Sequence, residues 1–203
     1  MEQHIIHIFK KHGGILRSQE LKEAGISYYA LNKMLEKGII EKIQRGLYRL
    51  EYLDIHKDLY FNVDEYKEVQ KIVPKGVLCL YSAAFIHELT TYIPDRYYVA
   101  IPKKNKVRLP KYPPIKLHYW DNKGYELGVR NIRLNRRYTL VYDREKTVCD
   151  FIKFRNKVGH DLTKEVLKTY LRSKKDRNMS KLRHYSKELR VYSKLNTYLN
   201  ILL

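Results

Sequence analysis

The spacing of capping residues and glycines between positions 14 and 50 constrains the fold more than any other feature of this sequence. Ser18 stands where an N-cap belongs, and Gly25 ends the short helical stretch that follows, because a residue without Cβ adopts the left-handed conformation cheaply. Ser27 then caps a second helical stretch, which Gly38 ends. Two short helices joined by a glycine-containing turn are typical of a helix-turn-helix, whose second helix can enter the major groove of DNA.

The second of these helices has two different faces. Leu31, Met34 and Leu35 recur at helical spacing and predict a buried face. The opposite face carries long side chains with polar tips: Tyr28, Tyr29, Asn32 and Lys33. An asparagine in a major groove pairs with adenine and a lysine reaches guanine, which predicts base readout by this face.

Two short apolar-rich segments follow the second helix, residues 39–43 and 47–50, and predict a β-hairpin, the wing of a winged helix. Residues 15–17 are a further short strand candidate against it. We expect the hairpin to contact the phosphate backbone or the minor groove through Lys42, Gln44, Arg45 and Arg49. Ser18 and Gln19, at the start of a helix, are candidates for a phosphate contact, and Ser27 belongs to the same predicted interface. The alternative is a small α+β packing unit without a ligand.

The net charge of +19 indicates a polyanionic partner, but most of the surplus lies outside the winged helix. Residues 1–50 carry 9 lysines and arginines against 5 acidic residues, and residues 74–203 carry 29 against 11. The candidate phosphate contacts of the second region are Lys103, Lys104, Lys106, Arg108, Arg136 and Arg137. Three roles are open for these residues. They extend the DNA footprint, they meet an acidic protein surface or structured RNA, or they form a general solvated surface.

The remaining chain predicts an α+β fold in three parts. Residues 1–50 form the winged helix-turn-helix domain, residues 51–75 a linker with an acidic helix, and residues 76–203 a mixed α/β domain with a small sheet and several C-terminal helices. Expected strands are residues 97–101, 115–120, 132–134 and 138–142. Expected helices are residues 64–73, one beginning near Ser82, and residues 145–156, 161–172, 180–189 and 191–202.

Two sets of side chains superficially suggest catalysis: Asp143 with Glu145 and Lys146, and Ser82 with His87 and Glu88. Glu145 and Lys146 are adjacent, without the one-residue separation of a nuclease motif, so we expect Asp143 to cap a helix and Lys146 to be solvated. The second set falls on one predicted helix without a nucleophile elbow. The sequence contains neither a P-loop nor GxGxxG, so we expect no enzyme activity and no cofactor.

Metal and membrane functions are not expected either. His4, His7 and His12 lack the cysteines or carboxylates that would complete a metal site. Cys79 and Cys149 stand in apolar surroundings and are expected to be reduced core residues. The sequence has no apolar run long enough for a membrane span and no signal-peptide core at its start, which predicts a soluble cytoplasmic protein. We expect a monomer or weak dimer.

Several segments, in this order, carry a resemblance to a known family. They are RGLYRL at 45–50, PKGVLCLYSA at 74–83, HELT at 87–90, VAIP at 99–102, YPP at 112–114, DREKTVCD at 143–150 and KFRNKVG at 153–159. Together they resemble the antitoxins of the AbiE abortive-infection system, the AbiEi family of type IV toxin–antitoxin modules. The resemblance covers nearly the whole chain.

This resemblance implies a protein of two parts. The N-terminal domain would bind inverted repeats in the promoter of its own operon and repress transcription. The C-terminal domain would counteract a co-encoded nucleotidyltransferase toxin in phage defence, without a stable complex between the two proteins. The alternative function is that of a winged-helix transcriptional regulator with no toxin partner.

Overall fold

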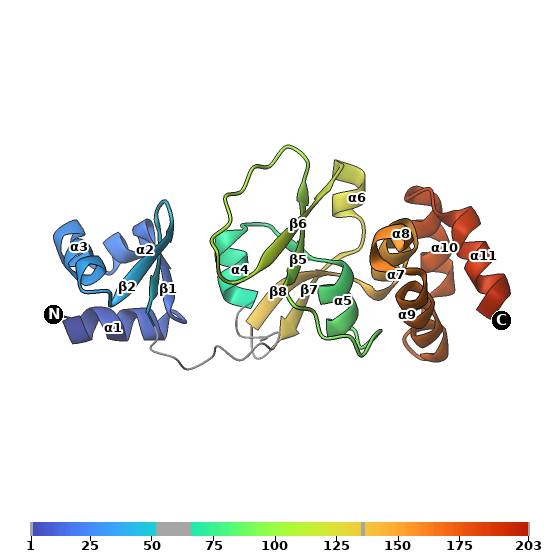
Figure 1. The fold of residues 1–203 in the computed structure, drawn as a ribbon, viewed down its shortest axis with the longest axis horizontal. Helices are drawn as coiled ribbons and strands as arrows, with labels where there is room; N and C mark the ends of the chain where they lie inside the picture. Colours follow the sequence, from blue (N-terminus) through green and yellow to red (C-terminus); the bar gives the residue numbers. More distant parts are fainter. Residues whose placement is uncertain (1, 52–65, 135–136, 203) are drawn as a thin grey trace. The chain divides into compact units, whose positions relative to one another are not determined.

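A computed structural model describes residues 2–51, 66–134 and 137–202. These residues divide into two compact units (Figure 1). The first contains residues 2–51 and 107–112, and the second contains residues 66–106, 113–134 and 137–202. Each unit contains helices and a sheet, which confirms the α+β class.

The first unit surrounds a small antiparallel sheet with three helices (Figure 1). Its elements are α1 (Glu2–Lys11), β1 (Ile15–Arg17), α2 (Ser18–Glu23), α3 (Tyr28–Glu36), β2 (Ile40–Gln44) and β3 (Leu47–Leu50). The sheet order is β1-β3-β2, so residues 15–17 do pair with the hairpin as predicted. Phe9, Leu16 and Met34 are almost fully buried in a core to which helices and sheet both contribute.

The second unit has a five-stranded mixed sheet in the order β6-β5-β4-β8-β7. Its N-terminal elements are α4 (Tyr66–Ile72), β4 (Val77–Leu78), α5 (Leu80–Ile86), β5 (Tyr97–Pro102), β6 (Ile115–Trp120), α6 (Asn122–Glu126), β7 (Val129–Leu134) and β8 (Arg137–Tyr142). The helices that follow are α7 (Arg144–Lys153), α8 (Arg155–Val158), α9 (His160–Arg172), α10 (Met179–Glu188) and α11 (Tyr192–Leu202). Helix α7 lies between the sheet and the last helices (Figure 1), and all its residues from Glu145 to Ile152 are buried.

The helix predicted at 64–73 packs as α4 against the sheet of the second unit. Gln70 Nε2 donates to Thr139 Oγ1 at 2.6 Å, and the rings of Tyr66 and Tyr97 meet edge to face with centroids 5.5 Å apart. Only Tyr66–Ile72 of the predicted helix is assigned here, since residues 64 and 65 lie outside the described residues. The acidic helix therefore contributes to the core of the second unit.

The start of one helix differs from the prediction. Helix α2 includes Ser18 as its first residue and has Arg17 as N-cap, where the Arg17 backbone N–H donates to the Glu20 carboxylate at 2.6 Å. Helix α5 begins at Leu80, near Ser82 as predicted. The buried Ser82 hydroxyl accepts the Tyr98 backbone N–H at 2.9 Å and so joins α5 to β5.

The prediction that Lys146 is solvated is wrong. Its side chain is fully buried, and Nζ lies 2.6 and 2.7 Å from the two carboxylate oxygens of Asp150, one helical turn along α7. The ammonium group also lies 3.9 Å from the ring centroid of Trp120 and 4.0 Å from that of Tyr142. A buried lysine requires such partners, since an unpaired charge in the interior is very costly. Asp143, by contrast, does cap α7, accepting the Lys146 backbone N–H at 2.9 Å.

The cysteines are where the sequence suggested. Cys79 and Cys149 are both free thiols in the core of the second unit, and burial raises the pKa of each. Within the described ranges, no group of three or more histidines, cysteines and acidic residues is arranged to hold a metal ion. No helix in the same ranges is both long and apolar enough to cross a membrane.

Candidate nucleic-acid interface

Helix α3 begins where the sequence places its cap. Ser27 has an extended backbone, and its Oγ accepts the Ala30 backbone N–H at 3.2 Å. This bond satisfies one of the N–H groups that have no partner inside the helix, and such a cap contributes about 1 kcal/mol. Ala30, Leu31 and Met34 then anchor one side of α3 in the core of the first unit.

The opposite side of α3 is open to solvent. Tyr28 and Tyr29 are 74% and 76% exposed. No other large apolar or aromatic residue that the structure describes is as exposed. Lys33 is exposed as well, and Asn32 is partly buried between the two faces. Neighbouring exposed aromatic residues beside a lysine and an amide are typical of a binding surface, because a folded monomer gains nothing by leaving them in water. Three of the four residues predicted for base readout are therefore fully accessible, and Asn32 is partly so.

The β2–β3 hairpin presents the second set of predicted residues. Gly46 has φ +73° and makes the tight turn that follows Arg45, whose side chain is exposed. The register shifts between Lys42 and Gln44, and this bulge rotates the end of β2. Lys42 is exposed and Gln44 partly so. The hairpin tip thus carries an accessible cation and an amide next to a basic strand residue.

Arg49 differs from the other basic residues of this set because it has an acidic partner. Its Nε donates to Glu41 Oε1 at 2.5 Å across the β2–β3 pair, and Nη2 contacts the same carboxylate. The guanidinium also lies 5.3 Å from the ring centroid of Tyr112. A phosphate contact by Arg49 would therefore have to compete with a carboxylate already in place.

The start of α2 lies beside the hairpin turn. The Ser18 backbone N–H donates to the Gly46 carbonyl at 2.9 Å. Both Ser18 and Gln19 are exposed, while Gln19 Nε2 donates to Glu23 Oε1 at 3.1 Å. The Glu20 carboxylate occupies the first turn of this helix, so it already stabilises the helix N-terminus that a phosphate would otherwise occupy.

The basic residues predicted for the second region lie mostly on one connection. Lys103, Lys104, Lys106 and Arg108 are all exposed in the segment between β5 and β6. Arg136 lies outside the described residues, and Arg137 is the first residue of β8. None of the four exposed residues forms an ion pair within the part of the chain that the structure describes, so their charges are available to a polyanion.

A comparison with known families now bears on these residues. Residues 3–50 match the family model described as "Transcriptional regulator, AbiEi antitoxin". The resemblance to the AbiEi antitoxins is confirmed over these residues. The match spans α1 to β3, and so contains the exposed face of α3 and the β2–β3 hairpin.

Among curated proteins, none matches the chain. Among solved structures, the chain is similar to the one titled "Crystal structure of RV2827C protein from Mycobacterium tuberculosis", with 14% sequence identity and a TM-score of 0.48. The alignment covers 98% of this chain and 78% of the other.

One surface feature, a groove in the second unit, is not indicated by any sequence pattern. Phe85, Leu134 and Glu165 all line it, although they come from α5, β7 and α9. No local motif links residues so far apart in the chain. Only the packing of α9 beside the end of α5 brings them together.

Proposed function

We propose that this chain is a DNA-binding transcriptional regulator that represses its own operon and acts as the antitoxin of a type IV module in phage defence. The observation that carries the proposal is the exposed, aromatic and basic face of α3 within the segment that matches the AbiEi regulators. In this proposal the first unit is a winged helix-turn-helix, with α3 as its recognition helix and the β2–β3 hairpin as its wing.

The proposed readout follows from the chemistry of the exposed side chains. Asn32 pairs with an adenine edge and Lys33 with a guanine edge, each discriminating against the wrong base by ~1–3 kcal/mol when well aligned. Tyr28 and Tyr29 contact the methyl groups of thymine and the sugar–phosphate backbone. Arg45 at the wing tip neutralises phosphate or enters the adjacent minor groove.

The test is a gel shift and footprint on the DNA upstream of the gene, with wild type and the double variant Asn32→Ala/Arg45→Ala. We expect protection of an inverted repeat by wild type and its loss in the variant. Lys194→Ala, which removes an exposed lysine on α11, is the control and should shift the same DNA as wild type. Equal protection by the double variant would exclude α3 and the wing as the reading elements.

We further propose that the second unit extends the DNA footprint through its basic connection. Each phosphate that a lysine neutralises changes the slope of log affinity against log salt by about 0.9. The triple variant Lys103→Gln/Lys104→Gln/Lys106→Gln should therefore lower the magnitude of this slope by up to about 2.7 units. An unchanged slope would assign these charges to another partner or to general solvation.

The antitoxin role requires its own experiment. We propose that the second unit counteracts a co-encoded nucleotidyltransferase toxin without a stable complex, as the family resemblance implies. Co-expression with the neighbouring reading frame should restore growth when the full chain is present. Growth rescue by Asn32→Ala/Arg45→Ala would separate neutralisation from repression, and absence of rescue by wild type would leave a regulator without a toxin partner.

A further inference from the structure

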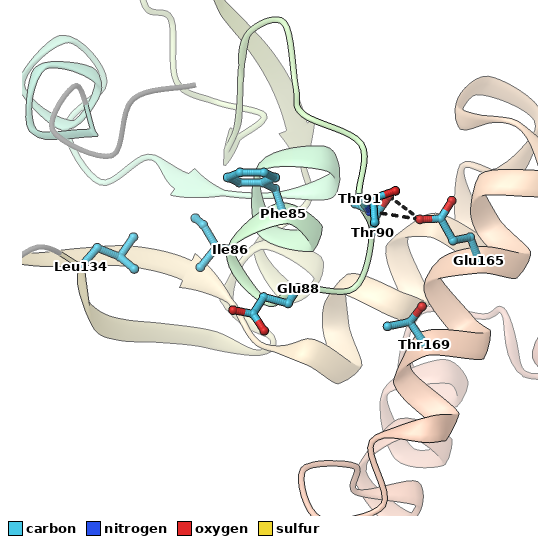
Figure 2. Close-up of a pocket in the computed structure, with 8 residues that line it drawn as sticks. All are labelled: Phe85, Ile86, Glu88, Thr90, Thr91, Leu134, Glu165 and Thr169. Atoms are coloured by element: carbon cyan, nitrogen blue, oxygen red, sulfur yellow. Dashed lines mark hydrogen bonds between the residues drawn. The ribbon is translucent and has the colours of Figure 1, made fainter. Parts of the chain in front are cut away.

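The second unit contains an open groove of about 500 Å³ that the proposed DNA-binding function does not use. Figure 2 shows Phe85, Ile86 and Leu134 on one side of it and the Thr90–Thr91 segment with Glu165 on the other. The groove has an apolar wall of half-buried side chains facing a polar one. Binding sites typically combine an apolar wall with a few polar groups in this way.

Glu165 is held in place on the polar wall. Its Oε1 accepts the Thr90 hydroxyl at 2.8 Å and the Thr91 backbone N–H at 3.2 Å (Figure 2). Thr90 itself is buried, and its Oγ1 also accepts the Tyr92 backbone N–H at 3.1 Å. Two donors on one oxygen hold the carboxylate beside the groove, and Oε2 has no hydrogen-bond partner among the described residues.

Glu88 supplies a second carboxylate from an unusual backbone position. It follows the end of α5 with φ +55°, where the Glu88 N–H donates to Phe85 O at 3.0 Å and the Leu89 N–H to Ala84 O at 2.8 Å. This is a Schellman motif, and glycine is the usual residue at the left-handed position. A glutamate is strained in this conformation. Its exposed side chain lies at the edge of the groove (Figure 2).

The charge of this groove is opposite to that of its surroundings. Residues 74–203 carry 29 lysines and arginines against 11 acidic residues. Six of those acids form ion pairs: Asp95, Asp143, Glu145, Asp150, Asp161 and Glu188. Among the described residues, neither Glu88 nor Glu165 forms one, and the groove lining includes no lysine, arginine or histidine. Two unpaired carboxylates in an otherwise basic unit disfavour nucleic acid and favour a cation.

We propose that this groove docks a segment of a partner protein in which a lysine or arginine lies next to an exposed leucine-, isoleucine- or phenylalanine-sized side chain. The apolar side chain packs on Phe85, Ile86 and Leu134, and the cation pairs with the carboxylates that line the groove, those of Glu88 and Glu165. Charge complementarity selects the cation, and the apolar wall adds the contact area that an ion pair alone does not supply. The residues that line the groove include none from α3 or from the β2–β3 hairpin.

The test uses the full chain and a library of phage-displayed random 12-residue peptides. Selection on wild type, with counter-selection on Glu88→Gly/Glu165→Gln, should enrich peptides that combine Lys or Arg with a neighbouring large apolar residue. Their affinity, measured by fluorescence anisotropy, should fall about tenfold in the double variant. Glycine relieves the strain at position 88, and glutamine keeps an acceptor for Thr90 and Thr91, so the double variant should fold.

The matched control is Glu126→Gln/Asp176→Asn, which removes two exposed acids outside the groove and should change affinity less than twofold. Absence of enrichment, enrichment of acidic peptides, or equal binding to both double variants would overturn the proposal.

Sedimentation velocity tests a second copy of this chain as the occupant. Self-association by wild type that the groove variant loses would replace the partner protein with that second copy. The gel shift on operator DNA should be the same for the groove variant and for wild type. A negative peptide-binding result is therefore distinguishable from failure of the proposed repressor function.

Discussion

The two units use charged and aromatic side chains in opposite ways. On α3 of the first unit, Tyr28, Tyr29 and Lys33 are exposed and anchored only through the buried side of their helix. On α7 of the second unit, Lys146 and Asp150 are fully buried and paired with each other. Both helices carry charged side chains in the sequence, and α7 carries more of them than α3. The difference teaches that a polar helix face signals function only where the structure leaves it open to a partner.

The largest effect is expected where a buried charge loses its partner. Lys146→Ala should lower the free energy of unfolding by about 3–5 kcal/mol, because the buried Asp150 carboxyl loses its cation and its hydrogen-bond donor. Urea denaturation measures the change. The double variant Lys146→Met/Asp150→Leu should recover much of the loss, since both charges are then replaced by apolar groups.

The exposed pair of α9 is the matched control for that prediction. Lys164 Nζ lies 3.5 Å from Asp161 Oδ1, and both side chains are largely in solvent. Lys164→Ala should change the stability by less than about 0.5 kcal/mol. Similar losses of stability in Lys146→Ala and Lys164→Ala would show that burial does not determine how much each ion pair contributes.

The next effect is on DNA affinity and should leave stability unchanged. Lys33→Ala and Tyr29→Ala remove exposed side chains of α3, so melting temperatures should stay within a degree or so of wild type while operator affinity falls by ~1–3 kcal/mol. Anisotropy titration at fixed salt measures the loss. A variant that weakened DNA binding only by unfolding the first unit would contradict the role given to this face.

A smaller effect should appear as a dependence of stability on pH. Burial, with Lys116 and Lys157 nearby, lowers the pKa of His118 from 6.5 to about 4. The unfolded chain therefore binds a proton more readily, so this residue's contribution to stability is complete above pH 6.5 and falls as the pH drops toward 4. Because His118 is partly exposed, we expect its protonation to lower the free energy of unfolding by only on the order of 1 kcal/mol between pH 7 and pH 5. This decrease should be absent in His118→Gln.

The same pH window contains an opposing group, which His118→Gln leaves in place. Burial raises the pKa of Asp150 to about 6 although Lys146 lowers it, so its protonation stabilises the folded state as the pH falls from 6 toward 4. Subtracting the wild-type curve from the His118→Gln curve isolates the histidine. His184→Gln, at an exposed position of α10, should reproduce the wild-type curve.

The smallest effect concerns the ion pair in the hairpin. Glu41→Gln should cost less than about 1 kcal/mol of stability, because the pair is partly in solvent. If Arg49 contacts phosphate, releasing it from Glu41 should raise operator affinity a few-fold and steepen the salt dependence by up to about 0.9. Unchanged affinity and slope would remove Arg49 from the interface.

Local sequence signals were sufficient for much of the first unit. Gly25, Ser27 and Gly38 end or cap helices through their own backbone preferences, so the two helices and the hairpin follow from residues close in the chain. Strand β6 begins and ends at the predicted residues because its flanks carry proline and aspartate. The match of residues 3–50 to the AbiEi regulators confirms the resemblance for the part where these signals are densest.

The second unit required the tertiary structure. Strand β4 has two residues, too few for a periodic signal, and becomes a strand only because β5 and β8 pair with it on both sides. Lys146 is polar by sequence, and only the packing of Trp120, Tyr142 and Asp150 around it makes burial tolerable. Likewise Glu88 and Glu165 share a groove because α9 packs near the end of α5. Sequence determines what is local, and long-range packing decides which charges meet solvent and which meet each other.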